Sequence, residues 1–159
     1  MEPSRSGARL IIVCGLPGSG KTTFAKTLES KLYAIRFCPD EWMEALGIDI
    51  YDEQRRAKIE ALQWQIAQQL LVRNLIVIIE WGTWGRSERN VLRLGARALG
   101  AAVELHYLHA PADVLFARIQ RRGMEHPPIE RHMLSDWFAK FQAPTAEELA
   151  LFDEPLLTV

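Results

Sequence analysis

The chain has 159 residues, of which 48% are hydrophobic and 25% are charged, as is ordinary for one globular domain. Its formal net charge of -1 gives no bulk attraction to nucleic acid or an anionic membrane, and its apolar runs are too short to span a bilayer. We therefore expect a single cytoplasmic domain over residues 1–159 with no membrane among its partners; nucleic acid is disfavoured as a partner, and a local basic groove stays open. Cys14 and Cys38 suit reduced thiols in that compartment.

The first half of the chain is predicted to alternate strands with helices. Residues 10–14 form a wholly apolar run, which is typical of a strand buried on both faces. Asp52 is a candidate N-cap for a long helix. The apolar stripe expected along that helix consists of Ile59, Leu62, Ile66 and Leu70. The predicted elements are strands at 10–14 and 33–38 and helices at 21–31, 40–46 and 53–73.

The second half continues the alternation. Residues 75–79 (LIVII) have the strongest strand character in the sequence, and Gly100 ends the helix that follows. Thr145 and Glu148 have the spacing of a capping box for a last short helix. The predicted elements here are strands at 75–79, 103–108 and 156–159, and helices at 87–99, 111–122 and 129–141.

Strands that alternate with helices indicate a parallel sheet covered by helices on both faces. Ligands of such sheets bind at the carboxyl ends of the strands. Gly15, Asp40, Glu80 and His109 each follow a predicted strand directly, so we expect them at one edge of the sheet. His109 is a candidate for contact with the adenine or ribose of a nucleotide.

Between the first strand and the first helix lies a complete G-x-x-x-x-G-K-T motif from Gly15 to Thr22. Such a loop directs backbone N–H groups at phosphates, and the helix that follows adds positive potential. We expect Lys21 to bridge the β- and γ-phosphates of ATP and the Thr22 hydroxyl to ligate Mg²⁺. The predicted nucleotide-binding residues are Gly15, Pro17, Gly18, Ser19, Gly20, Lys21, Thr22 and Thr23.

Two acidic residues after predicted strands are candidates for the chemistry. Asp40 is placed to accept the proton of a hydroxyl that attacks the γ-phosphate, and it equally suits the N-cap of the helix after it. Glu80 follows the strand at 75–79, where P-loop proteins place the carboxylate that holds Mg²⁺. The alternative for Glu80 is a solvated acid at a strand end.

Two further segments complete the expected site. Arg118 and Arg122 share one face of the helix at 111–122 and are candidates to clamp the transferring phosphoryl group from a lid over about 118–135. Cations also suit a helix C-terminus simply through its dipole. Trp81, Trp84 and Arg86 lie in a loop at the expected binding edge, where they suit contacts with an acceptor. For the two tryptophans, packing in the core is the open alternative.

Several motifs occur in the same order as in the small P-loop kinases grouped with zeta toxins, chloramphenicol phosphotransferase and phage-type polynucleotide kinase, which the chain resembles. It resembles most of all a bacterial branch of ATP-binding kinases. The motifs are GLPGSGKTT from Gly15, PDEW from Pro39, EWGTWGRSER from Glu80, ARIQRRG from Ala117 and PPIE from Pro127. The resemblance implies a P-loop NTPase fold with three α/β/α layers, a five-stranded parallel sheet in the order 2-3-1-4-5 and a small helical lid. It also implies that Asp40 is the general base and that Arg118 and Arg122 belong to the lid.

The chain departs from the polynucleotide kinases at two places. Those enzymes carry an arginine three residues after the catalytic aspartate, where this chain has Met43. They also carry Asp-Thr-Asn after the third strand, where this chain has Glu80-Trp81-Gly82. Both departures weigh against a polynucleotide substrate and leave phosphoryl transfer from ATP intact.

The sequence therefore predicts an ATP- and Mg²⁺-dependent kinase that acts on a hydroxyl of a small molecule. Two alternatives stay open, namely a 5′-hydroxyl kinase of nucleotides or polynucleotides and an ATP-binding regulatory module without an acceptor. The sequence does not identify the acceptor or the oligomeric state.

Overall fold

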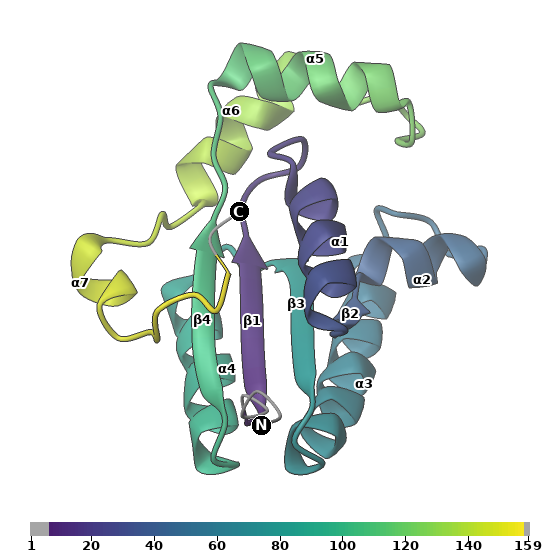
Figure 1. Ribbon diagram of the computed structural model, residues 1–159. Coiled ribbons are helices and arrows are strands. Elements are labelled where there is room, and N and C mark those ends of the chain that lie inside the picture. The colour runs from purple at the N-terminus through teal and green to yellow at the C-terminus, as the bar shows by residue number, and fades with distance from the viewer. Residues whose placement is uncertain (1–6, 158–159) are drawn as a thin grey trace.

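The computed structural model describes residues 7–157, which form a parallel sheet of four strands between layers of helices (Figure 1). The strands are β1 (Arg9–Cys14), β2 (Ile35–Phe37), β3 (Ile76–Gly82) and β4 (Ala102–Tyr107), in the order β2-β3-β1-β4. The helices are α1 (Lys21–Leu32), α2 (Pro39–Ala45), α3 (Glu53–Val72), α4 (Arg86–Ala98), α5 (Ala112–Arg122), α6 (Arg131–Lys140) and α7 (Ala146–Leu149). The predicted α/β class with a parallel sheet is confirmed.

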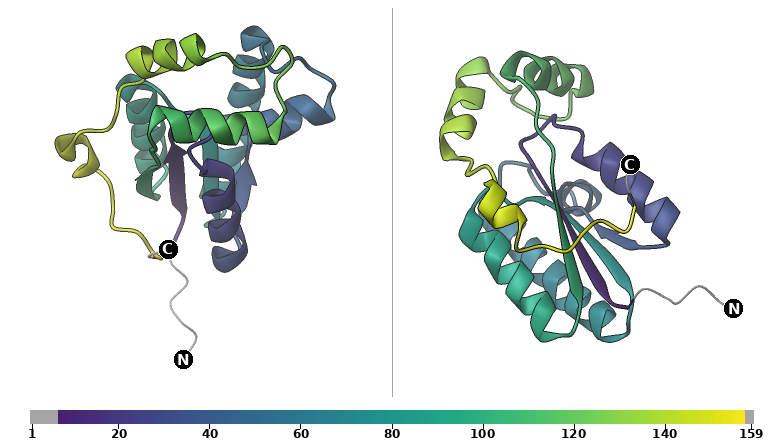
Figure 2. Two further views of the ribbon diagram at one scale, coloured as in Figure 1. Left: turned by 90° about the horizontal axis from the view of Figure 1, so that it is seen from above. Right: turned by 60° about the vertical axis from the view of Figure 1, so that its left-hand side comes forward.

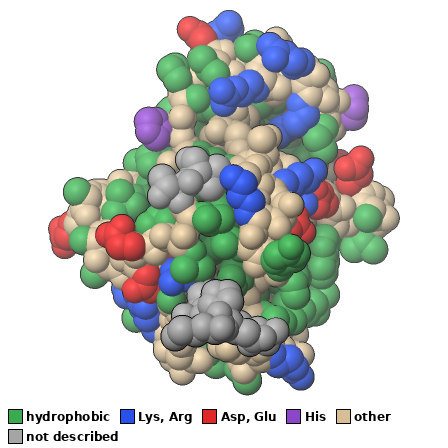
Figure 3. All heavy atoms as spheres, viewed as in Figure 1, with side chains coloured by type: hydrophobic (Ala, Val, Ile, Leu, Met, Phe, Trp, Pro, Cys, Tyr) green, Lys and Arg blue, Asp and Glu red, His purple; other side chains and the backbone are tan. Residues whose placement is uncertain are grey.

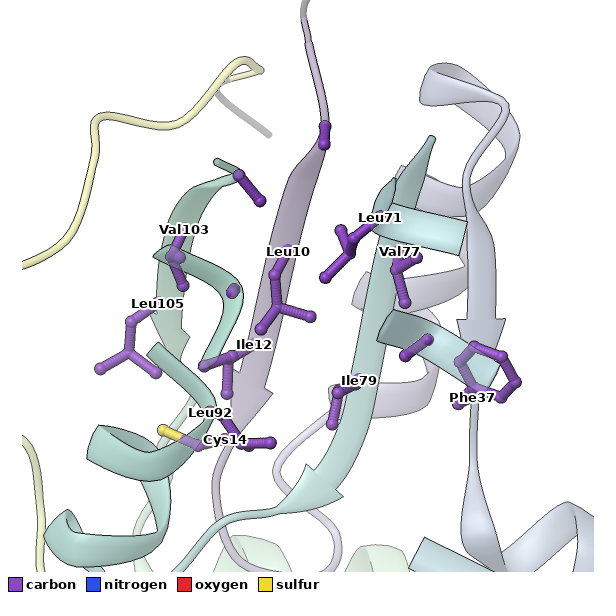
Figure 4. Close-up of a cluster of buried hydrophobic side chains, with 14 residues drawn as sticks. Leu10, Ile12, Cys14, Phe37, Leu71, Val77, Ile79, Leu92, Val103 and Leu105 are labelled. Carbon is purple, nitrogen blue, oxygen red and sulfur yellow. The ribbon is translucent and has the colours of Figure 1, made fainter. Parts of the chain in front are cut away.

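Strand β1 lies at the centre of the sheet, which explains why its sequence is apolar without alternation. Leu10, Ile12 and Cys14 point toward α3 and α4 and pack in one cluster with residues of those helices (Figure 4). Ile11 and Val13 point to the opposite face, where they pack with residues of α1. Because β1 is covered on both faces, each of its side chains needs an apolar neighbour.

The prediction of five strands in the order 2-3-1-4-5 is wrong. The described sheet ends at β4, and Leu156 and Leu157 form a bend. The Leu156 N–H donates to the Glu104 carboxylate at 3.1 Å and makes no ladder bond, so this apolar segment is tied to β4 through a side chain. Residues 158 and 159 of the predicted strand lie outside the described residues.

The buried face of α3 differs by one position from the predicted stripe. Leu62 is 47% exposed, whereas Gln63 is fully buried and follows Ile59 at a spacing of four residues. The Gln63 side chain accepts a hydrogen bond from the Trp81 indole at 2.8 Å. The Gln63 amide nitrogen has no hydrogen-bond partner among residues 7–157, and apolar periodicity alone does not reveal a buried polar residue.

Three predicted helix ends are present, whereas the N-cap of α2 is Cys38, so the alternative of Asp40 as an N-cap is wrong. The Asp52 side chain accepts from the Arg55 N–H at 3.0 Å, as an N-cap does. Thr145 accepts from the Glu148 N–H at the start of α7, while the Glu148 side chain turns away from the cap. Gly100 follows α4 with φ of 79°, a left-handed conformation that glycine adopts without strain.

Helices α5 and α6 cross over the carboxyl ends of the strands (Figures 1 and 2). They pack on the P-loop through a separate apolar cluster that includes Leu16, Leu115 and Ile129. The Tyr51 hydroxyl donates to the Pro127 carbonyl at 2.6 Å, so the loop before α3 also contacts the segment between α5 and α6. None of the described helices is both long and apolar enough to cross a membrane.

Candidate active site

The loop between β1 and α1 has the geometry of a phosphate cradle, and two of its glycines are required by close approach. A Cβ at Gly15 would collide with the Leu108 carbonyl, which belongs to the segment after β4. Gly18 has φ of 82°, and a Cβ there would lie 2.9 Å from the Leu115 carbonyl oxygen of α5. The loop is therefore held between the sheet and the lid with its backbone close to both.

Two polar groups of this loop fit a triphosphate. The Ser19 hydroxyl is buried without a hydrogen-bond partner among residues 7–157. The Lys21 ammonium donates to the Leu16 carbonyl at 3.0 Å, and burial lowers the pKa of Lys21 to about 8, although the charges of Glu80 and Asp40 act in the opposite direction. A desolvated cation at a helix N-terminus is suited to an anionic ligand that restores its charge.

Glu80 stands at the end of β3 and joins the P-loop to the edge strand. The Thr22 hydroxyl donates to one of its carboxylate oxygens, and Arg36 of β2 donates to the other at 2.8 Å. A hydroxyl beside a carboxylate suits Mg²⁺ that takes its remaining ligands from phosphates and water. Within the described residues no group of three or more His, Cys, Asp or Glu side chains could hold a metal by itself.

Asp40 lies in the first turn of α2, and sequence reasoning missed its partner. Arg56, in the first turns of α3, donates to Asp40 Oδ1. The other oxygen, Oδ2, has no partner among the residues that the structure describes. Met43, which stands where the polynucleotide kinases carry an arginine, is a buried residue of α2. No local pattern reveals Arg56, because it reaches Asp40 from another helix.

One cavity of about 600 Å³ brings most of the predicted site residues together. Its P-loop side contains Pro17, Lys21, Thr22, Asp40 and Glu80. Trp81 and Trp84 also line it, and both pack on other parts of the molecule. Trp81 donates to Gln63, and the Trp84 ring lies 6.1 Å from the Trp137 ring of α6. These two tryptophans therefore line the cavity and also pack against other residues, and their contact with an acceptor stays a prediction.

The two lid arginines differ in their surroundings. Arg122 lines the cavity and pairs with the buried Glu125. Arg118 lies on the outer side of the loop and donates to the Gly18 carbonyl at 3.1 Å. Arg86 and His109 do not line the cavity; His109 is exposed and its ring lies 5.1 Å from that of Tyr107.

Sequence reasoning also missed two carboxylates on the side of the cavity farther along α3 and α4. Glu60 and Glu88 line the cavity and are half-buried. On the sequence each has the appearance of a solvated helix residue, so nothing local distinguishes it. Only the packing of α3 beside α4 brings both to the acceptor side of the site.

The charges on the surface are mixed in sign. On the face that Figure 3 draws, basic side chains gather over the lid helices and acidic ones over the α7 segment. This distribution differs from the continuous basic track of proteins that bind long nucleic acids.

A P-loop followed by α1, with a parallel sheet and strand-end carboxylates, defines a P-loop NTPase-like fold. Residues 10–144 match the profile of a protein family described as an AAA domain, and the chain belongs to that family.

Solved structures of kinases share this fold. A sugar kinase from Janibacter sp. HTCC2649 is 26% identical with a TM-score of 0.60, over 89% of this chain and 82% of that one. A gluconokinase from Sinorhizobium meliloti 1021 is 18% identical with a TM-score of 0.59, over 91% of this chain and 80% of that one. A chain of the Pnkp1/Rnl/Hen1 RNA repair complex is 18% identical with a TM-score of 0.72, over 96% of this chain and 48% of that one.

Proposed function

We propose that the protein is an ATP-dependent kinase that transfers the γ-phosphate to a hydroxyl of a small molecule. The observation that carries the proposal is the single cavity that joins Lys21 and Thr22 of the P-loop to Asp40 and to an aromatic wall. The fold shared with a sugar kinase and a gluconokinase supports phosphoryl transfer. The motif resemblance to the zeta toxin and chloramphenicol phosphotransferase group supports it as well.

In this proposal the residues of the P-loop side bind and orient the donor. Lys21 neutralises the β- and γ-phosphates, and Thr22 and Glu80 hold Mg²⁺ directly or through its water. The bound ion supplies charge neutralisation on the phosphate oxygens. Arg122 and Arg118 approach the transferring group from the lid, where cations stabilise charge that develops in the transition state.

Asp40 is the proposed general base. Arg56 holds one carboxylate oxygen, which fixes the orientation of the carboxylate and leaves Oδ2 free for the acceptor. The acceptor oxygen attacks the γ-phosphorus, its proton moves to Asp40, and the bond to the β–γ bridging oxygen breaks to release ADP. Trp81 and Trp84 form the wall against which the acceptor lies, and Arg86 stays a candidate contact from the start of α4.

The test is phosphate transfer from [γ-³²P]ATP to a panel of hydroxyl compounds, with a 5′-hydroxyl oligonucleotide included and free phosphate measured in parallel. We expect transfer to small molecules to exceed hydrolysis. Asp40→Asn should reduce transfer by about 10²–10⁴-fold and leave ATP affinity near its original value, because the carboxylate faces the acceptor.

Asp136→Asn is the matched control, since this aspartate is exposed on α6 and has no side-chain partner in the described chain. It should transfer phosphate at the original rate. Normal transfer by Asp40→Asn would rule out the proposed base. Transfer to the oligonucleotide alone would favour the 5′-hydroxyl kinase, and nucleotide binding without transfer to any compound would favour a regulatory module.

A further inference from the structure

The acceptor side of the cavity contains two carboxylates that the protein leaves without a cation. Glu60 comes from the middle of α3 and Glu88 from the first turn of α4. Both line the cavity and are half-buried. Across residues 7–157 neither forms an ion pair or a hydrogen bond with another side chain.

Glu53 also lines the cavity without an ion pair to any described residue, but it is exposed to solvent. The remaining carboxylates of the cavity are paired. Asp40 pairs with Arg56, Glu80 with Arg36, and Glu125 with Arg122. Three cations are thus already engaged by acids, and Lys21 faces the P-loop. The acceptor side therefore has two carboxylates without an ion pair of their own in the described protein, and only the charges of Arg56 and Arg89 offset them from a distance.

The two unpaired carboxylates also repel one another. Burial is the main reason that the pKa of Glu60 is raised to about 7; the charges of Glu88 and Asp40 act in the same direction and Arg56 opposes them. Burial likewise raises the pKa of Glu88. Keeping two desolvated carboxylates ionised at one wall costs free energy in the empty protein, and a cation bound between them would offset that cost.

A third polar group points to a ligand independently of these acids. Thr83 lines the same cavity, is 1% exposed, and its hydroxyl has no nitrogen or oxygen hydrogen-bond partner in the part of the chain that the structure describes. The Cys14 thiol, a weak hydrogen-bonding group, is its neighbour. A buried hydroxyl without an oxygen or nitrogen partner is costly, and a polar ligand in the cavity would satisfy it.

The surroundings favour an organic cation over a metal ion. Calcium requires about six to eight oxygen ligands, whereas Glu60 and Glu88 are two residues outside any group of three metal-binding side chains in the described chain. Aromatic rings line the same space, from Trp81 and Trp84. Rings beside carboxylates suit an ammonium group attached to a partly apolar body, through both charge and cation–π attraction.

We propose that the acceptor is a small hydroxyl compound that carries a primary ammonium group, as amino alcohols and amino sugars do. The ammonium lies between Glu60 and Glu88, the body lies against the tryptophan wall with a polar contact to Thr83, and the reacting hydroxyl faces Asp40. This inference rests on the proposed kinase function and names the class of its acceptor.

The experiment compares matched acceptors that differ in the amine. The first pair is 4-(aminomethyl)benzyl alcohol and 4-methylbenzyl alcohol, and the second set is D-glucosamine, D-glucose and N-acetyl-D-glucosamine. The expected kcat/KM is at least about tenfold higher for the amine in each set, as charge-assisted hydrogen bonds provide. Glu60→Gln should remove most of that preference by raising KM for the amines much more than KM for the neutral compounds.

Glu44→Gln is the matched control, because this exposed acid of α2 lies outside the cavity. It should keep the full preference for amines. Calorimetric binding of the two benzyl alcohols in the presence of Mg²⁺ and a non-hydrolysable ATP analogue provides a readout that does not need transfer. We expect the amine to bind more tightly and Glu60→Gln to abolish the difference.

The outcomes separate the two proposals. Transfer to neutral compounds at rates equal to the amines, or a preference that survives Glu60→Gln, would overturn the ammonium site and leave the kinase standing. Preferential amine binding without transfer to any compound would support the site and count against the kinase. Absence of preferential amine binding in the calorimeter would overturn the inference in every case.

Discussion

Two neighbouring residues of α4 carry opposite charges and differ in whether the protein supplies a partner for the charge. Arg89 is fully buried and donates four hydrogen bonds, two to the Glu148 carboxylate and one each to the carbonyls of Thr83 and Gln142. Glu88 faces the cavity beside Glu60 with no side-chain partner in the described residues. The charge of Arg89 is paired within the described protein, whereas the charge of Glu88 has no ion-pair partner there.

The difference separates a structural charge from a candidate recognition charge. Arg89 and Glu148 connect α4 to α7, and together they fix the segment that returns to the sheet after the lid. A buried ion pair of this kind needs every donor and acceptor satisfied. Within the described chain Glu88 has a hydrogen bond only with the Gly85 backbone at the start of α4 and no ion pair, so its desolvation is consistent with a cationic ligand that completes it.

Breaking the closed pair should produce the largest effect. Glu148→Ala leaves the Arg89 guanidinium buried without its carboxylate, and we expect a loss of about 3–5 kcal/mol in the free energy of unfolding, measured by urea denaturation. Glu147→Ala, at the exposed neighbouring acid of α7, should change stability by less than about 0.5 kcal/mol. Equal effects of the two substitutions would contradict the structural role of the pair.

The second effect concerns Lys21, a buried cation that is open toward the nucleotide. Its pKa is lowered to about 8 by burial, so phosphate binding should raise that pKa and take up a proton at pH 8. The calorimetric enthalpy of ATP binding should then vary with the ionisation enthalpy of the buffer. Lys21→Met should abolish this variation and weaken binding by about 10–100-fold, since a charge-assisted contact is lost.

Lys31→Met provides the control on the same helix, because Lys31 is exposed in the last turn of α1. It should retain both the affinity and the dependence on buffer. A wild-type enthalpy that is the same in all buffers at pH 8 would mean that Lys21 is already fully charged before ATP binds.

These two charges also differ in how far the sequence predicts them. Lys21 belongs to a motif whose spacing and context specify both the loop and its ligand, so its place was predictable from residues 10–22 alone. Arg89 lies in α4, and its partner Glu148 is 59 positions away in the sequence, where no motif connects the two residues. Only the assembled fold decides which acid a given arginine reaches.

The same limit explains the other differences. Strands and helices with strong periodicity were predicted within a few residues, because local pattern controls them. The fifth strand was predicted from two leucines, but Leu156 is held by the Glu104 side chain, a contact that no local pattern specifies. Arg56, Glu60 and Glu88 were missed because charged residues on helices usually face solvent, and only the packing of α2, α3 and α4 brings them to one cavity.

The smallest effect, and the one of opposite sign, is expected for Glu60→Gln. The folded pKa of Glu60 is raised from 4.5 to about 7, first by burial and then by Glu88 and Asp40 against the pull of Arg56. The unfolded chain therefore loses this proton near pH 4.5 while the folded protein keeps it until about pH 7. Stability from this group falls as pH rises through that window, and the penalty is complete above it.

Glutamine keeps the shape of the side chain and removes the titration. The variant should match the ligand-free wild type near pH 5 and exceed its stability at pH 8, by less than about 1 kcal/mol because solvent screens a partly exposed charge. Urea denaturation at the two pH values measures the difference, and Glu44→Gln should show none. If Glu60→Gln is less stable than wild type at pH 8, the Glu60 charge has a structural role in the fold, as the Glu148 charge does. A gain at pH 8 would instead mean that the empty protein is strained by an acid whose partner comes from outside the chain.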